Sequence, residues 1–311
     1  MAGLEDRAVG AVLGLALGDA LGAPFEFERR DAIVAPLPAF ELPWMGLPPG
    51  STTDDTAMAR NLVRSLGERG GFDPDDLVRR HVEWLATGPP DVGNLTGKVL
   101  ARIRAGTSSS DAARQVWEER GPEVSAGNGS VMYCAPLGVA YAGRPGELHD
   151  LAPRLSALTH WDERCRTCVL AVCLAVASLV RGEPPSDAIG QALGPGVIER
   201  DGGEELEYLV GNAGEVRRID GPDMGLCLFT AGVGLQALAR LAAGDAGSVE
   251  DELTRVVAFG GDTDTNAAVA GALLGAAVGV DGLPAAWLDR LADREAIGNE
   301  ARALAPLAAQ E

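Results

Sequence analysis

Residues 260–268 read Gly260-Gly261-Asp262-Thr263-Asp264-Thr265-Asn266-Ala267-Ala268. Within this stretch Asp262–Thr265, which we call the second acidic motif, supplies two carboxylates and two hydroxyls in four consecutive residues. A run of small apolar residues follows from Ala267 to Val280 and predicts a helix, and Asp and Thr are common caps at a helix N-terminus. One cap needs only one such side chain, so the excess of oxygen donors indicates a further role.

A similar cluster, the first acidic motif (Thr53-Asp54-Asp55-Thr56), also precedes a predicted helix. Carboxylate and hydroxyl oxygens without neighbouring His or Cys favour magnesium, manganese or calcium over zinc. If the two motifs meet in the fold, repulsion among their carboxylates would call for a cation. Asp262 and Asp264 alternate with threonines and could bridge two ions. We therefore predict one cation site shared by both motifs.

Composition limits the class of protein. The chain has 311 residues, of which 46% are apolar, so it can bury a large core. Its net charge of −19 argues against binding nucleic acid through a basic surface, and most of the acids are expected to be surface residues that favour solubility.

Cysteine usage and apolar runs predict the compartment. Five cysteines, an odd number, and no signal-peptide pattern in residues 1–20 predict reduced thiols and a cytoplasmic location. Cys165 and Cys168 have CxxC spacing, but no second ligand pair follows, so we interpret them as core residues. The longest apolar runs, such as Thr167–Val180, are shorter than the ~20 residues that cross a bilayer, so no membrane association is expected.

The pattern of apolar residues predicts an all-α chain with a single domain over residues 1–311, because no period-two alternation indicates a sheet. Gly10, Gly14, Gly18 and Gly22 share one face of the first helix, where another helix could approach closely. Asp19 on the same helix must be partnered, by backbone N–H groups or by a metal shell. Helices are predicted at 4–22, 57–69, 74–87, 98–104, 110–120, 131–142, 163–181, 225–243, 248–258, 266–280, 284–293 and 299–308, with short helices and loops over 183–224.

Several residues outside the acidic motifs are candidates for chemistry. Glu26 lies between two phenylalanines, where an apolar surround would raise its pKa and suit acid–base catalysis; the alternative is an exposed Glu on an irregular segment. Asp91 lies in a Gly/Pro-rich loop before a predicted helix.

The loop Ser125–Ser130 consists of small residues and could hold phosphate oxygens on its N–H groups, or simply connect two helices. Tyr133 could stack on a ring or merely pack. His160, at a helix start, is expected to be neutral and able to hydrogen-bond a ligand.

Taken in order, these motifs resemble the ADP-ribosylglycohydrolases, a family that includes the dinitrogenase reductase-activating glycohydrolase. The resemblance covers nearly the whole chain and rests on 18–27 (GDALGAPFEF), 53–56 (TDDT), 91–94 (DVGN), 127–130 (GNGS), 159–160 (TH) and 261–265 (GDTDT). It implies an all-α fold, a single compact orthogonal helical domain with a central cleft that holds two Mg²⁺ or Mn²⁺ ions.

The resemblance also implies roles for individual residues. The metal ligands would be Thr53, Asp54, Asp55, Asp262, Asp264 and Thr265, with Asp264 the best candidate to bridge both ions. Glu26, Asp55 and Asp264 are the expected catalytic residues. Contacts to substrate are expected from Asp91, Gly93, Gly127, Asn128, Gly129, Ser130, Tyr133 and His160.

The implied reaction is hydrolysis at C1″ of an ADP-ribosyl group, with the metals holding the ribose hydroxyls. Glu26, or a metal-bound water that it activates, would transfer the proton. The expected partner is an arginine-linked ADP-ribosylated protein; the alternatives are a small ADP-ribose conjugate or nucleoside-like substrate, or non-catalytic ADP-ribose binding. Tyr133 and Trp161 depart from the family pattern and indicate a shift in substrate rather than loss of activity. We expect a monomer.

Overall fold

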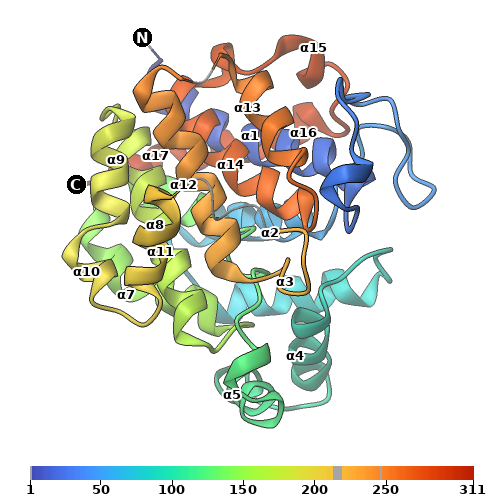
Figure 1. Ribbon diagram of the computed structural model, residues 1–311. Helices are drawn as coiled ribbons and strands as arrows, with labels where there is room; N and C mark the ends of the chain where they lie inside the picture. The colour runs from blue at the N-terminus through green and yellow to red at the C-terminus, as the bar shows by residue number, and fades with distance from the viewer. Residues whose placement is uncertain (1, 213–218, 246) are drawn as a thin grey trace.

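Two apolar helices, α1 (Leu4–Gly22) and α14 (Thr263–Val278), lie side by side through the centre of the protein (Figure 1). The computed structural model describes residues 2–212, 219–245 and 247–311. The helices run antiparallel, because Gly10 of α1 faces Gly275 near the end of α14 and Gly18 faces Ala267 near its start. A Cβ on Gly14 would overlap the backbone carbonyl of Gly271. The predicted close approach at the glycine face is therefore confirmed, and it is a contact of backbone with backbone.

Both helices are buried on nearly all sides, which explains why neither sequence shows a polar face. By length and composition the segment Leu4–Phe25 could cross a membrane, but 94% of its apolar window is buried inside the protein. We interpret it as a core helix.

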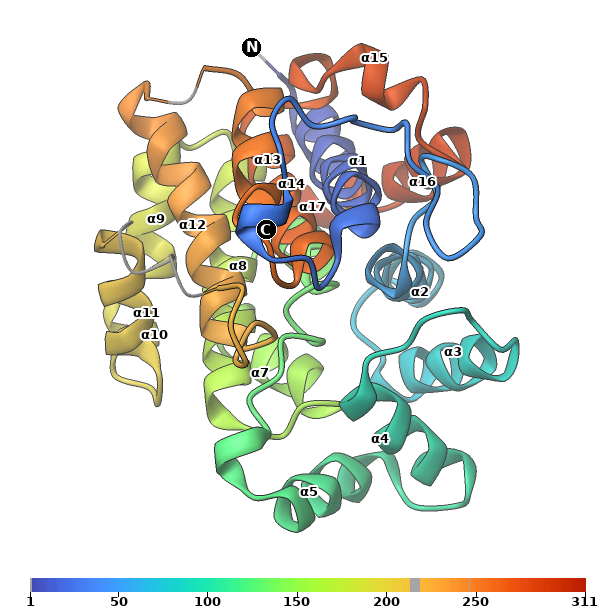
Figure 2. The ribbon, with the colours of Figure 1, turned by 45° about the vertical axis from the view of Figure 1, so that its right-hand side comes forward.

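The other helices surround this pair. Around it pack α2 (Asp54–Arg69), α8 (Glu163–Val180), α12 (Cys227–Ala243), α13 (Val249–Val257) and α16 (Arg294–Arg302). Helices α3 (Pro74–Ala86), α4 (Asn94–Arg104) and α5 (Ser109–Arg120) continue from α2 and form the lower end of the molecule (Figure 2). The short helix α6 (Ala135–Ala140) is fully buried against α1, α2 and α8. The rest of the periphery consists of α7 (Leu148–Ala157), α9 (Pro185–Ala192), α10 (Pro195–Ile198), α11 (Gly203–Gly211), α15 (Ala285–Leu288) and α17 (Ala305–Ala308).

The prediction of an all-α chain is confirmed, since the described residues contain helices and no strand. The predicted helix 131–142 is wrong at its start: α6 begins at Ala135, because Val131 and Met132 donate to the carbonyl of Asn128 in a turn. The sequence reading missed α7, which has a proline inside it, and predicted too long a helix at 284–293, where α15 spans Ala285–Leu288. Part of the predicted irregular segment, 213–218, lies outside the described residues.

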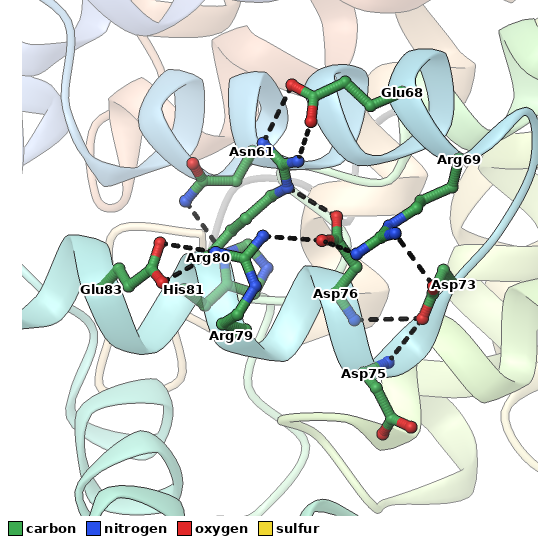
Figure 3. A network of polar contacts seen from close by, with 10 residues as sticks. All are labelled: Asn61, Glu68, Arg69, Asp73, Asp75, Asp76, Arg79, Arg80, His81 and Glu83. Atoms are coloured by element: carbon green, nitrogen blue, oxygen red, sulfur yellow. Dashed lines mark hydrogen bonds and ion pairs between the residues drawn. The ribbon is translucent and has the colours of Figure 1, made fainter.

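A buried carboxylate joins α2 to α3. The Asp76 side chain is 1% exposed and accepts hydrogen bonds from Arg69 at 2.9 Å, Arg79 at 2.7 Å and Arg80 at 2.6 Å (Figure 3). Burial disfavours its ionised form, but the three arginines outweigh burial and hold the Asp76 pKa well below its ordinary value. Figure 3 also shows Asn61 bonded to His81, with the two nitrogen atoms 3.3 Å apart; burial lowers the pKa of His81 to about 3, so this side chain is neutral and packs in the core.

We predict that Gly14→Ala lowers the free energy of unfolding by about 2–3 kcal/mol, because its methyl group would enter the α1–α14 backbone contact. Urea unfolding measures this. Gly190→Ala is the matched control: Gly190 is an exposed helical glycine with nothing within 4 Å of the new methyl, so a gain of about 0.5–1 kcal/mol is expected. Equal effects of the two substitutions would contradict the packing argument.

We predict that Asp76→Asn destabilises the protein by about 1.5–3 kcal/mol at pH 7, because it removes a buried acceptor of charged hydrogen bonds. A depressed carboxyl pKa stabilises the fold above the unfolded-state pKa of about 3.9 and loses that effect as pH falls. The stability gap between wild type and variant should therefore be constant at neutral pH and shrink below about pH 4, as measured by urea unfolding over a pH series. Glu83→Gln, on an exposed member of the same network, should change stability by less than about 0.5 kcal/mol. A gap that persists unchanged at low pH would show that the Asp76 charge does not matter.

Candidate metal and substrate site

The packing of α1 against α14 places Glu26 beside the second acidic motif. After α1, the chain makes the 3₁₀ turn Ala23–Phe25 and pairs with the loop that precedes α14. The Phe27 N–H donates to the Gly261 carbonyl at 2.7 Å, and the Gly261 N–H donates to the Glu28 carbonyl at 2.8 Å. Gly260 and Gly261 have φ values of 73° and 77°, a region that favours glycine. Glu26 thus directly precedes a segment that two backbone hydrogen bonds fix to this loop.

Asp19 anchors the first acidic motif to α1. Its buried carboxylate accepts hydrogen bonds from the Thr53 N–H at 3.0 Å and from the N–H and hydroxyl of Thr56. Burial raises the Asp19 pKa to about 6, although these hydrogen bonds oppose the shift. Of the two predicted partners for Asp19, backbone N–H groups are the ones observed. The start of α2 is therefore attached to α1 one turn before α1 ends.

The two acidic motifs meet. The Thr265 hydroxyl donates to Asp55 Oδ2 at 3.4 Å, and the Thr53 hydroxyl donates to the same oxygen at 3.1 Å. Glu26, Asp262 and Asp264 each offer a carboxylate oxygen, and these oxygens lie within 4.8 Å of one another. Asp55 Oδ1 is buried with no hydrogen-bond partner among the described residues. A cluster of three carboxylates, joined through Thr265 to an acid with an unpartnered buried oxygen, is an arrangement that a cation would complete.

Gathering these carboxylates is electrostatically costly. Burial first, and then the charges of Asp91, Asp262 and Asp54, raise the pKa of Glu26 to about 8, with the Trp44 indole opposing. Burial and Asp91 likewise raise the pKa of Asp54 to about 8, against the Gly93 N–H, which donates to it at 3.1 Å. Ionised together, the acids would repel one another unless a positive charge lay between them.

The donor set fits a hard divalent cation. Burial, followed by the charge of Asp262, holds the pKa of Asp264 well above its ordinary value, and burial followed by Asp19 does the same for Asp55. The site offers carboxylate and hydroxyl oxygens from both motifs, with no thiol among the described residues that line its cavity, so Mg²⁺ or Mn²⁺ suits it better than zinc. The structure brings together the predicted metal ligands, and their role as ligands stays a prediction.

A cavity of about 390 Å³ opens above these acids. Its wall includes most of the predicted substrate residues: Asp91, Gly93, Gly127, Asn128, Gly129 and His160. The Asn128 amide donates to Asp262 Oδ2 at 2.9 Å and to the Thr230 hydroxyl at 3.0 Å, so Asn128 also positions an acid of the second motif. Gly129 allows close approach, because a Cβ there would lie 2.8 Å from Cε1 of His160.

His160 is neutral, as predicted, although the main cause is burial and not its place at a helix start. Burial lowers its pKa to about 3, with the nearby Asp162 opposing. Its Nδ1 is 2.9 Å from the Thr159 hydroxyl, and its ring lines the cavity. A neutral imidazole beside the glycine loop can exchange a hydrogen bond with a ligand and adds no charge.

Two predicted substrate residues lie behind the cavity wall. Tyr133 is fully buried, packs edge-on against His81 with ring centroids 5.3 Å apart, and does not line the cavity. Ser130 is also fully buried, and its hydroxyl is 2.9 Å from that of Ser156. Neither side chain lines the cavity, because α6 begins beyond both residues and they point into the core; their part in substrate binding stays a prediction. Trp161 stacks on Arg166 at 4.1 Å and does not line the cavity either.

The sequence reading missed the residues that hold the acids in place. Thr230 donates to the Asn266 side-chain oxygen at 2.8 Å, which links Asn128, α12 and α14. Asn266 follows the second acidic motif directly, and Thr230 is a polar residue in an apolar helix. Both positions could therefore have been identified from the sequence as candidates for supporting the acids. The five cysteines are free and buried, as expected for core residues.

The chain matches one family of known proteins over its full length. The family model described as ADP-ribosylglycohydrolase matches residues 1–311. The chain is 33% identical over 302 residues to the ADP-ribosyl-[dinitrogen reductase] glycohydrolase of Rhodospirillum rubrum, covering 93% of this chain and 91% of the relative. It is 27% identical to the ADP-ribosylarginine hydrolase Tri1 of Serratia proteamaculans (98% and 81% covered) and 27% identical to human ADP-ribosylhydrolase ARH3 (89% and 87% covered).

A solved structure agrees as well. The protein chain of an "ADP-ribosylglycohydrolase-related protein complex" superposes with a TM-score of 0.77 at 30% identity, covering 99% of this chain and all of that one. The resemblance seen in the sequence motifs is thus confirmed over the full length. The chain belongs to the ADP-ribosylglycohydrolase family.

Proposed function

We propose that this hydrolase cleaves the C1″ glycosidic bond of ADP-ribosyl-arginine on proteins, with two Mg²⁺ or Mn²⁺ ions, and releases ADP-ribose. The observation that carries the proposal is the convergence of Glu26 and both acidic motifs at the floor of one cavity. Relatives that act on ADP-ribosyl groups support it. The five free cysteines support a reducing compartment such as the cytoplasm.

Different residues of the chain would hold the cations, transfer the proton and orient the substrate. Both acidic motifs would hold the cations, whose charge orients the ribose hydroxyls. Glu26 lies among Asp54, Asp91 and Asp262 and is the candidate to move the proton at the scissile bond. The glycine loop and neutral His160 would fix the distal part of the substrate, so that the sugar meets Glu26 in one orientation.

Two observations favour arginine as the acceptor. Asp91 lines the cavity near Glu26 and offers a carboxylate to a guanidinium group. Asp54 and Asp91 also line a small side cavity of about 160 Å³, whose walls include Trp44 and Trp84. Aromatic rings beside carboxylates favour a flat cation. The runner-up substrate is a small ADP-ribose conjugate, which would use the same sugar site.

We predict that Asp264→Ala abolishes both divalent-cation binding and turnover, because it removes a buried carboxylate from the proposed bridging position. Titration calorimetry with MgCl₂ and MnCl₂ gives the first measurement, and ADP-ribose release gives the second. Asp289→Ala, on an exposed side chain paired with Arg294, is the control and should leave both unchanged. An Asp264→Ala enzyme that still binds the ion and turns over would show that Asp264 is not an essential metal ligand.

We predict that the protein with Mg²⁺ releases ADP-ribose from ADP-ribosylated arginine, and that chelation by EDTA stops the release. The acceptor is tested by offering an arginine-modified protein and a free ADP-ribose conjugate side by side. Turnover of the free conjugate alone would select the runner-up. Binding of ADP-ribose without hydrolysis of either would select a non-catalytic protein.

A further inference from the structure

Arg120, the last residue of α5, lies where two cavities join. The cavity above the acidic motifs continues into a second one of about 430 Å³. The two share Arg120, Asn94, Val124, Gly127 and Gly225 in their walls. None of the acids beneath the first cavity lines the second, so the shared residues mark the junction between an acidic end and a far end.

Arg120 stands out by its charge. Among the described residues, the ionisable side chains that line the two cavities are seven acids (Glu26, Asp54, Asp91, Glu123, Asp223, Asp262 and Asp264), the neutral His160, and Arg120. In a protein of net charge −19, an anionic ligand meets repulsion at every other charged position that the described residues give this groove. Arg120 is therefore where negative charge on a ligand would be most favourable in the groove.

The guanidinium of Arg120 also has donors to offer. One of its Nη2 protons goes to the Val124 carbonyl at 2.9 Å, which holds the side chain at the junction. Among the described residues it forms no ion pair and no other hydrogen bond, whereas Arg114 on the same helix pairs with Asp111 and Glu118. A planar fork with free N–H groups matches phosphate oxygens and can bind two of them at once.

We propose that Arg120 binds the diphosphate of the ADP-ribosyl group and thereby sets the direction in which the substrate lies. The ribose with the scissile bond then points to Glu26 and the acidic motifs, and the nucleoside occupies the second cavity. There Glu123 and Asp223 can accept hydrogen bonds from hydroxyl or amino groups but would repel phosphate. This assignment of Arg120 as a binding residue rests on the proposed function.

The test measures ADP-ribose affinity by titration calorimetry on the full-length protein with Mg²⁺. Arg120→Ala should weaken ADP-ribose about 10- to 100-fold, the loss expected for charged hydrogen bonds, and raise KM with little change in kcat. Arg120→Lys keeps the charge but loses the fork, so its affinity should fall between those of wild type and Arg120→Ala. Arg114→Ala is the matched control from the same helix and should bind as wild type does.

A purely structural role would give a different pattern. Loss of the Arg120–Val124 bond could loosen the 122–124 turn, so adenosine, which has no phosphate, is titrated in competition on the same variants. Adenosine affinity within about two-fold of wild type, with ADP-ribose weakened, supports the diphosphate contact. Equal loss of both ligands with a fall in kcat, or unchanged ADP-ribose affinity in Arg120→Ala, overturns it. Failure of the wild type itself to bind ADP-ribose would overturn the proposed function, and the Arg120 assignment with it.

Discussion

The structure depends on the backbone contact between α1 and α14. Glycines every fourth residue let the two helices touch without intervening side chains, and their antiparallel direction puts the end of α1 beside the start of α14. The Thr263 hydroxyl donates to the Gly22 carbonyl at 2.8 Å, and Asp19 fixes the start of α2 from the same end of α1. One helix end therefore collects Glu26 and both acidic motifs, segments that are far apart in sequence.

That assembly is electrostatically incomplete by itself. Buried carboxylates lie together here without a counter-charge. For this reason the pKa values of Glu26 and Asp54 are raised, and one oxygen of Asp55 has no hydrogen-bond partner among the described residues. Elsewhere the protein pairs its buried acids, as Asp76 is paired with three arginines. The difference separates an acid that holds two helices together from acids arranged to take up a cation.

Residue type and spacing predicted the helical class, the glycine face and the residues of both motifs, because each is a local signal. They did not predict the positions of side chains that depend on residues distant in the sequence. Tyr133 could stack or pack by its sequence alone, and only the late start of α6 turned it into the core against His81. Arg120 belonged to no recognisable motif, and its position at the junction depends on distant segments, such as the one containing Gly225, that line the same two cavities.

The chain's local patterns were enough to establish an all-α protein with hard oxygen donors at two helix starts and a glycine-lined helix that must meet another backbone. Such features follow from covalent spacing and the periodicity of a helix, which a sequence displays directly. Which donors share a site, which side chains line the cavity and which acids stay unpaired depend on long-range packing. Distances such as the 3.4 Å between Thr265 and Asp55 join residues that the sequence separates widely, so only the tertiary structure determines them.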